Sequence, residues 1–131
     1  MDFDKNGYYR DSMFDKVELV CGNHALHGSE RVDMELFQDT VHMTSFYRCR
    51  NYVSYAASSR DHASCRNRLG SLQMIKILDR LSRAQEGSFG IETTDITGLA
   101  FTLKPEGILC RVLSHDVGTG KVVLEVYNPR F

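Results

Sequence analysis

The chain has 131 residues, 42% of them hydrophobic and 25% charged, and 16 basic against 17 acidic side chains leave a net charge of −1. These values are typical of a globular domain and exclude a disordered chain or a protein built mainly to coat nucleic acid. No stretch approaches the roughly 18–20 apolar residues that a membrane span needs. The polar, acidic start has no secretory signal, so we expect a single cytoplasmic domain spanning residues 1–131.

The first half of the chain predicts three strands. The first, at 16–21, ends before Gly22. Residues 31–37 alternate between apolar and polar side chains, which indicates a half-buried strand. Residues 41–49 are rich in β-branched and aromatic side chains and predict a third strand. Residues 50–69 show no clean period and predict a long loop, which in a compact domain usually has a function or a tether.

One helix is predicted after Gly70, with Ser71 as its N-cap and Gly87 as its end. Its apolar stripe has helical spacing and consists of Leu72, Ile75, Leu78 and Leu81, widened by Met74 and Ile77.

Three further strands follow, at 99–103, 108–112 and 122–126, and the last two are joined by a hairpin through 118–120. The order of three strands, a helix and three strands predicts an α+β fold. We expect small antiparallel sheets with a zinc-ribbon-like N-terminal half, one main helix and a C-terminal β-hairpin.

A group of cysteines and histidines is the most informative motif. Cys21-Gly-Asn-His24 has the spacing of a zinc knuckle, and Gly22 allows the tight turn that aims both side chains at one point. Cys49 and Cys65 are the predicted partners. The sequence therefore predicts a structural zinc site made of Cys21, His24, Cys49 and Cys65, which would tether the long loop.

Alternatives to this set remain open. His62, in His62-Ala-Ser-Cys65, can replace His24 or Cys65 as a ligand. Cys110 alternates in phase with buried positions and is expected to pack in the core. Buried free thiols are the main competing interpretation of the other cysteines, with a disulfide framework less favoured in a chain that is not exported.

The segment 47–68 concentrates basic charge. It holds one acid, Asp61, and five arginines, with tyrosines 47, 52 and 55 between them; the arginines are Arg48, Arg50, Arg60, Arg66 and Arg68. Arginine beside aromatic residues is used for phosphate contact and base stacking, so these five are the predicted nucleic-acid contacts. Residues 1–36 carry eight acids and four bases, and the two segments can instead complement each other within the fold.

Catalytic motifs are missing from the sequence: it has no nucleophile elbow, zincin motif, Walker loop or dinucleotide-binding glycine motif. His24 and His27 can in principle activate the Cys21 thiolate, but a knuckle thiol is more readily interpreted as a ligand. His42 and His115 lie in strand contexts and are expected to be structural. We therefore expect a protein that is not an enzyme and has no small-molecule substrate.

Several segments resemble one bacterial group: Asn6-Gly-Tyr-Tyr9, 13–21 ending in Leu-Val-Cys21, Ser45-Phe-Tyr-Arg-Cys49, Cys65-Arg-Asn-Arg-Leu69, the helix at 71–83, and Val126-Tyr-Asn-Pro129. The group consists of small proteins of no assigned mechanism that are encoded in integrative and conjugative elements of gut Firmicutes, of the vancomycin-resistance-transposon type. Arg50 and Arg66 depart from the Pro and Asn of the group's pattern. The resemblance implies a bacterial cytoplasmic accessory protein of a mobile element.

Together these features predict a non-enzymatic, zinc-stabilised accessory module of a conjugative element, which contacts nucleic acid or a protein of the transfer or regulatory machinery. The alternative is a metal-free protein-interaction or structural domain.

Overall fold

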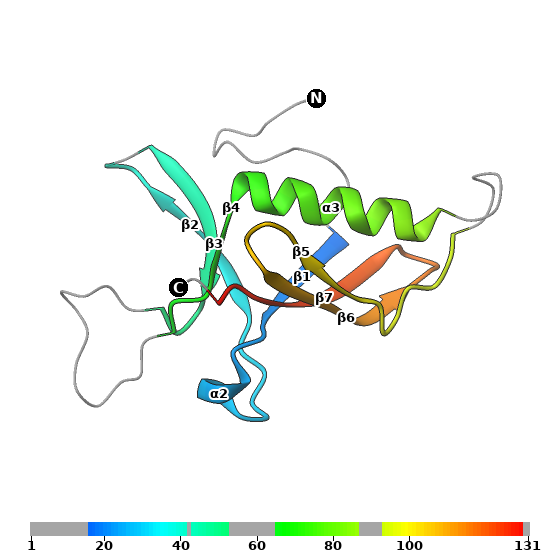
Figure 1. Cartoon of the computed structure of the whole chain (residues 1–131), viewed down its shortest axis with the longest axis horizontal. Helices are drawn as coiled ribbons and strands as arrows, with labels where there is room; N and C mark the ends of the chain where they lie inside the picture. Colours follow the sequence, from blue (N-terminus) through cyan, green and yellow to red (C-terminus); the bar gives the residue numbers. More distant parts are fainter. Residues whose placement is uncertain (1–15, 42, 53–64, 87–92, 130–131) are drawn as a thin grey trace.

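A computed structural model describes residues 16–41, 43–52, 65–86 and 93–129. Two sheets and one long helix make up this part of the chain, which confirms the predicted α+β class (Figure 1). The larger sheet has the strand order β1-β7-β6-β5 and the smaller one β2-β3-β4. The elements are β1 (Val17–Cys21), α2 (His24–His27), β2 (Met34–Asp39), β3 (Thr44–Cys49), β4 (Arg68–Gly70), α3 (Ser71–Gln85), β5 (Ala100–Leu103), β6 (Ile108–Asp116) and β7 (Lys121–Tyr127).

The predicted C-terminal hairpin is formed by β6 and β7. The Asp116 carboxylate accepts hydrogen bonds from the backbone amides of Gly118 and Thr119, and the Gly120 amide donates to the Asp116 carbonyl at 2.7 Å. Gly120 has φ +79°, a conformation that favours glycine. The side chains of β6 alternate between the core and the open face, so one face of the sheet is available to pack against the helix.

The larger sheet joins the two ends of the described chain, because β1 pairs in parallel with β7. Leu19 lies opposite Leu124, and Cys21 lies opposite Val126. Hydrophobic alternation predicts a strand but not its partner, so this pairing was not foreseeable from the pattern. An isolated bridge between Val20 and Asp33 links the end of β1 to the chain just before β2.

The smaller sheet is a hairpin of β2 and β3 with β4 added to its edge, and it extends to one side of the helix (Figure 1). β2 and β3 begin three residues later than predicted, and Leu36 on β2 is 38% exposed. The segment 50–69, expected to be a loop, contains the start of β4. The stretch 53–64 within it lies outside the described residues.

The long helix α3 differs from its prediction in two details. Gly70 is the N-cap, and its amide donates to the Gln73 side chain at 2.6 Å. The buried stripe consists of Met74, Ile77, Leu78 and Leu81, at the i, i+3, i+4, i+7 spacing, while Leu72 is 64% exposed. Gly87, the predicted end, lies outside the described residues, and the helix ends at Gln85. Neither helix in the described ranges has the length and apolar character of a membrane span.

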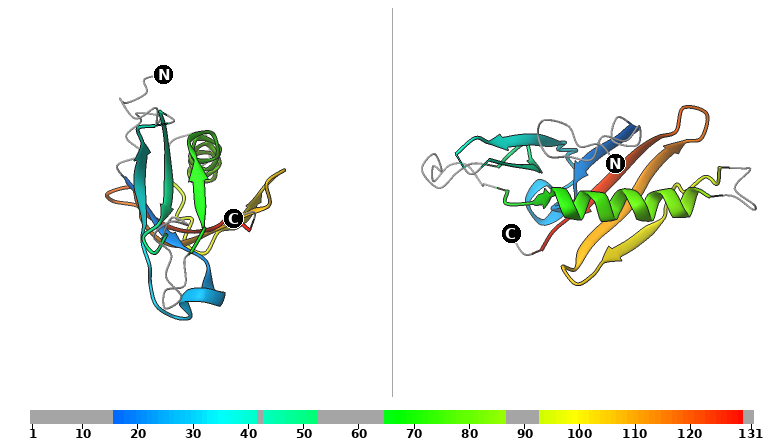
Figure 2. Two further views of the ribbon diagram at one scale, coloured as in Figure 1. Left: turned by 90° about the vertical axis from the view of Figure 1, so that its left-hand side faces the viewer. Right: turned by 90° about the horizontal axis from the view of Figure 1, so that it is seen from above.

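The buried apolar residues form one cluster between α3 and the larger sheet, along which the helix lies (Figure 2). Ile108, Val112, Val122 and Leu124 line its sheet side. The cluster also includes three cysteines, 21, 49 and 65, from the region where the two sheets meet. The core is therefore apolar along the helix and rich in sulfur at this junction.

Candidate metal centre

Four potential metal ligands converge where the two sheets meet. They are Cys21 at the end of β1, His27 at the end of α2, Cys49 at the end of β3, and Cys65 shortly before β4. One ligand atom from each lies within 4.8 Å of all the others. The three cysteines are those that the sequence predicted, and the structure brings them together from three separate segments.

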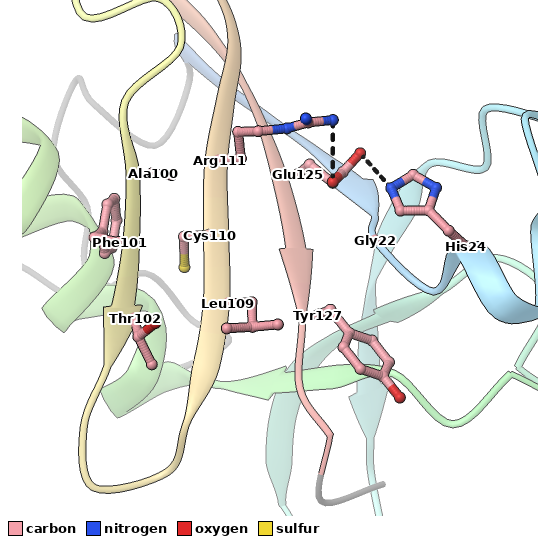
Figure 3. Close-up of a pocket in the computed structure, with 10 residues that line it drawn as sticks. All are labelled: Gly22, His24, Ala100, Phe101, Thr102, Leu109, Cys110, Arg111, Glu125 and Tyr127. Atoms are coloured by element: carbon pink, nitrogen blue, oxygen red, sulfur yellow. Dashed lines mark ion pairs between the residues drawn. The ribbon is translucent and has the colours of Figure 1, made fainter.

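The predicted histidine was wrong, because His24 does not reach the cluster. The turn after Cys21 lies against β7, where the Gly22 amide donates to the Val126 carbonyl at 2.8 Å. His24 is therefore placed beside β7, and its Nε2 lies 3.0 Å from a carboxylate oxygen of Glu125 (Figure 3). His27, at the other end of the single turn of α2, has its Nε2 3.4 Å from the Cys49 sulfur.

A sequence signal for His27 was present. Asn23 and Gly28 bracket the four residues of α2, and Gly28 has φ +62°, as expected of a glycine that ends a helix. A one-turn helix at this point places His27, at its end, beside the cysteines of the cluster. The other proposed histidine, His62, lies outside the described residues.

Two of the distances in the cluster are close to those around a tetrahedral ion. With Zn–S near 2.3 Å and Zn–N near 2.0–2.1 Å, tetrahedral geometry requires about 3.8 Å between sulfurs and about 3.6 Å between sulfur and nitrogen. The Cys21 and Cys65 sulfurs are 3.6 Å apart, and the Cys49 sulfur is 3.4 Å from the His27 nitrogen. These two distances, together with the 4.8 Å limit on the others, are compatible with one metal ion between three thiols and one imidazole.

Each sulfur also receives a hydrogen bond from an asparagine. Asn67 donates its side-chain amide to Cys21 at 3.1 Å, and Asn23 donates to Cys65 at 3.4 Å. The backbone amide of Asn51 donates to Cys49 at 3.4 Å. Donors around a thiolate stabilise its charge and orient it, as outer-shell partners do in metal sites.

Asn67 connects the cluster to the larger sheet. It is fully buried, and the amide that reaches Cys21 also donates to the Val126 carbonyl at 2.8 Å. Its side-chain oxygen accepts from the backbone amide of Asn128 at 2.8 Å, and the Asn128 side chain donates to the Arg68 carbonyl at 3.0 Å. A buried polar network links the cysteines, the end of β7 and the start of β4.

The cluster thiols differ electrostatically from the fourth cysteine. Hydrogen bonding from Cys21, and then from Cys49, lowers the pKa of the Cys65 thiol, whereas hydrogen bonding with Cys21 and Cys65 raises the pKa of Cys49. Of these thiols, Cys65 therefore ionises most readily. Cys110 lies apart in the core as predicted, and burial raises the pKa of its thiol to about 12.

The predicted nucleic-acid arginines are dispersed. Arg48 and Arg68 lie directly opposite each other on β3 and β4. Arg50 pairs with Asp33 at 3.4 Å. Arg66 is half-buried before β4, and Arg60 lies outside the described residues. Of the four of these arginines in the described part of the chain, Arg48 and Arg68 are the two that share one sheet face.

That face also carries aromatic side chains. The Arg48 guanidinium lies 3.9 Å from the centre of the Phe37 ring, and that of Arg68 lies 5.1 Å from the Phe46 ring. The two phenylalanine rings are 5.2 Å apart. We call these four residues the Arg–Phe face.

No protein-family model, curated protein or solved structure matches this chain. The resemblance to conjugative-element proteins stays a prediction.

Proposed function

We propose that Cys21, His27, Cys49 and Cys65 hold a structural Zn²⁺ ion that joins the two sheets. The observation that carries this proposal is the convergence of four ligand atoms within 4.8 Å from separate segments of the chain. Three thiolates and one imidazole suit Zn²⁺, and four protein ligands complete a structural site with no position for a substrate. Because such a site supplies folding energy, the ion stabilises the junction.

The proposed role of the zinc-stabilised domain is that of a non-enzymatic accessory module of a conjugative or mobile element that contacts nucleic acid. The Arg–Phe face supports this role. Arg48 and Arg68 lie directly opposite each other on β3 and β4, and a carboxylate oxygen of Glu35 on β2 lies 3.4 Å from Arg48. Guanidinium groups can donate to phosphate groups, and guanidinium groups stacked on rings present flat surfaces to bases. A protein of the transfer machinery is the alternative partner.

Elemental analysis of protein purified without added zinc tests the metal. We expect about one equivalent of zinc per chain in the wild type and in Cys110→Ala, since Cys110 packs in the core away from the cluster. Less than about half an equivalent in the wild type would contradict the proposal.

Salt-dependent binding to DNA tests the partner. Replacing Arg48 and Arg68 together with Gln should weaken binding and reduce the slope of log affinity against log salt by about 1.4–1.8, since each phosphate contact contributes roughly 0.7–0.9. Arg83→Gln is the matched control, because Arg83 pairs with Asp79 on the surface of α3, away from this face. An unchanged slope in the double variant would remove the Arg–Phe face from the proposal.

A further inference from the structure

A pocket lies on the open face of the larger sheet, next to the turn that leads into α2 (Figure 3). Cys110 and Val112 of β6 point into the core, so Leu109 and Arg111 point to the other side, away from α3. None of the four candidate metal ligands lines the pocket. The pocket is thus a separate site that no part of the proposed function uses.

Strand register arranges the pocket as two rows across three strands. Ala100, Arg111 and Glu125 form one row, and Thr102, Leu109 and Tyr127 form the other. Directly opposed side chains in an antiparallel pair have Cβ atoms about 4.5–5.5 Å apart, and neighbouring rows are about 7 Å apart. The first row contains the charged pair Arg111 and Glu125. The second row contributes the apolar Leu109 and the aromatic Tyr127.

The hollow arises because the side chains at its borders are small. Ala100 and Thr102 leave space at β5, and Gly22 brings the chain against β7 on the other side. A Cβ on Gly22 would lie 3.1 Å from the Val126 carbonyl oxygen and 3.2 Å from the Tyr127 Cβ, so a larger residue would push this wall away. The resulting pocket measures about 350 Å³, enough for a planar heterocycle.

The polar groups form an ordered set. One oxygen of Glu125 lies 3.0 Å from His24, and the other lies 3.5 Å from Arg111. The Glu125 side chain is 14% exposed, and its two oxygens already have Arg111 and His24 as partners. A carboxylate offers about four acceptor positions, and Arg111 has five donors, which leaves both groups able to bind a ligand. An acceptor and a donor therefore lie side by side above an apolar floor.

We propose that this pocket binds a guanine base. Guanine presents N1–H and the N2 amino group to a carboxylate and O6 and N7 to a guanidinium, and arginine to O6 and N7 is the commonest base-specific contact in proteins. Glu125 and Arg111 take these two edges, while Leu109 and Tyr127 contact the face of the ring, as in single-strand recognition. Adenine lacks the matching donors, and cytosine offers one amino group.

The guanine can belong to a single strand or to a free nucleotide. The strand source rests on the proposed contact with nucleic acid, whereas the free-nucleotide source does not. The chemistry of the pocket is the same in both cases, so the two sources are arms of one experiment.

The experiment measures binding to the full chain by calorimetry with GMP and AMP, and by fluorescence anisotropy with labelled oligothymidine carrying one central G, A or C. We expect G to be preferred by about ten- to a hundredfold, the range of one bidentate base contact. A preference for guanine among the nucleotides, among the oligonucleotides or in both supports the proposal. The measurement in which it occurs shows whether the guanine belongs to a free nucleotide or to a single strand. Equal binding of all bases, or no binding of GMP and of the G-containing strand at millimolar concentration, overturns it.

Glu125→Gln should abolish the preference for guanine, because the amide cannot accept from both guanine donors. Glu18→Gln is the matched control. Glu18 lies on β1 outside the pocket and pairs with Arg31 and Lys121. Circular dichroism and zinc content report whether both variants are folded. A guanine preference that survives in folded Glu125→Gln overturns the proposal. Because zinc content and the salt slope of the Arg–Phe face are measured separately, failure of the pocket is distinguishable from failure of the proposed function.

Discussion

The junction of the two sheets and the space between α3 and the larger sheet are equally buried but chemically different. Under α3 the interior consists of aliphatic side chains such as Ile77, Leu81, Val122 and Leu124. At the junction it consists of three thiols and the fully buried amides of Asn67 and Asn128. Burial of aliphatic surface stabilises the first region without help. Buried amides need hydrogen-bond partners, and thiols are smaller than the aliphatic side chains, so the second region depends more on its hydrogen bonds and on the proposed ion.

The largest expected effect is that of removing the metal. A chelator should release the junction while the β6–β7 hairpin stays folded. Hydrogen exchange should accelerate at least a hundredfold at the amides of Cys49, Arg50 and Cys65, whose acceptors lie in segments that the ligands hold together. Amides of Val112 and Leu124 should keep their protection.

Thiol alkylation gives an independent reading of the same experiment. We expect the three cluster cysteines to react after chelation, and Cys110 to react only in denaturant, because its thiol is buried and its pKa is raised to about 12. Global loss of protection, or reaction of all four cysteines on chelation, would contradict a division into two regions.

The aliphatic region can be weakened without touching the junction. Leu124→Ala should lower the free energy of unfolding by about 2–5 kcal/mol, the usual cost of a cavity in a packed core. The zinc content of the folded variant should stay at one equivalent. Loss of zinc from folded Leu124→Ala would show that the regions are not separable.

Asn67 belongs to both regions, so its replacement should affect both. Asn67→Ala removes the donor to Cys21 and to the Val126 carbonyl, and leaves the Asn128 amide without its acceptor. We expect a loss of about 2–4 kcal/mol in unfolding free energy. Zinc affinity should fall about ten- to a hundredfold in a competition with a chelating dye. A change in one quantity alone would assign Asn67 to one region.

The smallest effect concerns His24. Hydrogen bonding to the Glu125 carboxylate, and then to the Gly28 carbonyl, raises the pKa of His24. A raised pKa in the folded state means that this pair contributes stability below about pH 6.5, and that the contribution is lost as the pH rises through the folded-state pKa. The contribution should be small because the ring is 58% exposed. An NMR titration should show the pKa of His24 falling in Glu125→Gln, and an unchanged value would contradict the pairing.

Local patterns predicted the elements well where one periodicity dominates. The stripe of α3 and the alternation of β6 and β7 follow directly from the spacing of apolar residues. The partner of β1 did not follow, because a strand ending at Cys21 has no local feature that selects β7 over β2. The wrong face assigned to Leu72 has another cause: at about 100° per residue it lies roughly 200° around the helix from Met74, so it is not on the buried stripe.

The candidate site was predicted in three of its four ligands. Cys21, Cys49 and Cys65 stand out because Cys110 has an alternative place in the core pattern. His24 was predicted from knuckle spacing alone, with His62 as the alternative, and His27 was not among the predicted ligands. The turn after Cys21 contacts β7, and this contact places His24 beside Glu125. The spacing of residues in the sequence does not predict such a tertiary contact.

Replacing each of the two histidines in turn is the most direct test of the metal centre at the junction. Zinc content should be measured after purification without added metal in His27→Ala and His24→Ala, two substitutions of the same kind within one helical turn. The cluster geometry predicts loss of most zinc from His27→Ala and about one equivalent in His24→Ala. Full zinc content in His27→Ala, or loss confined to His24→Ala, would contradict the assignment of the metal centre.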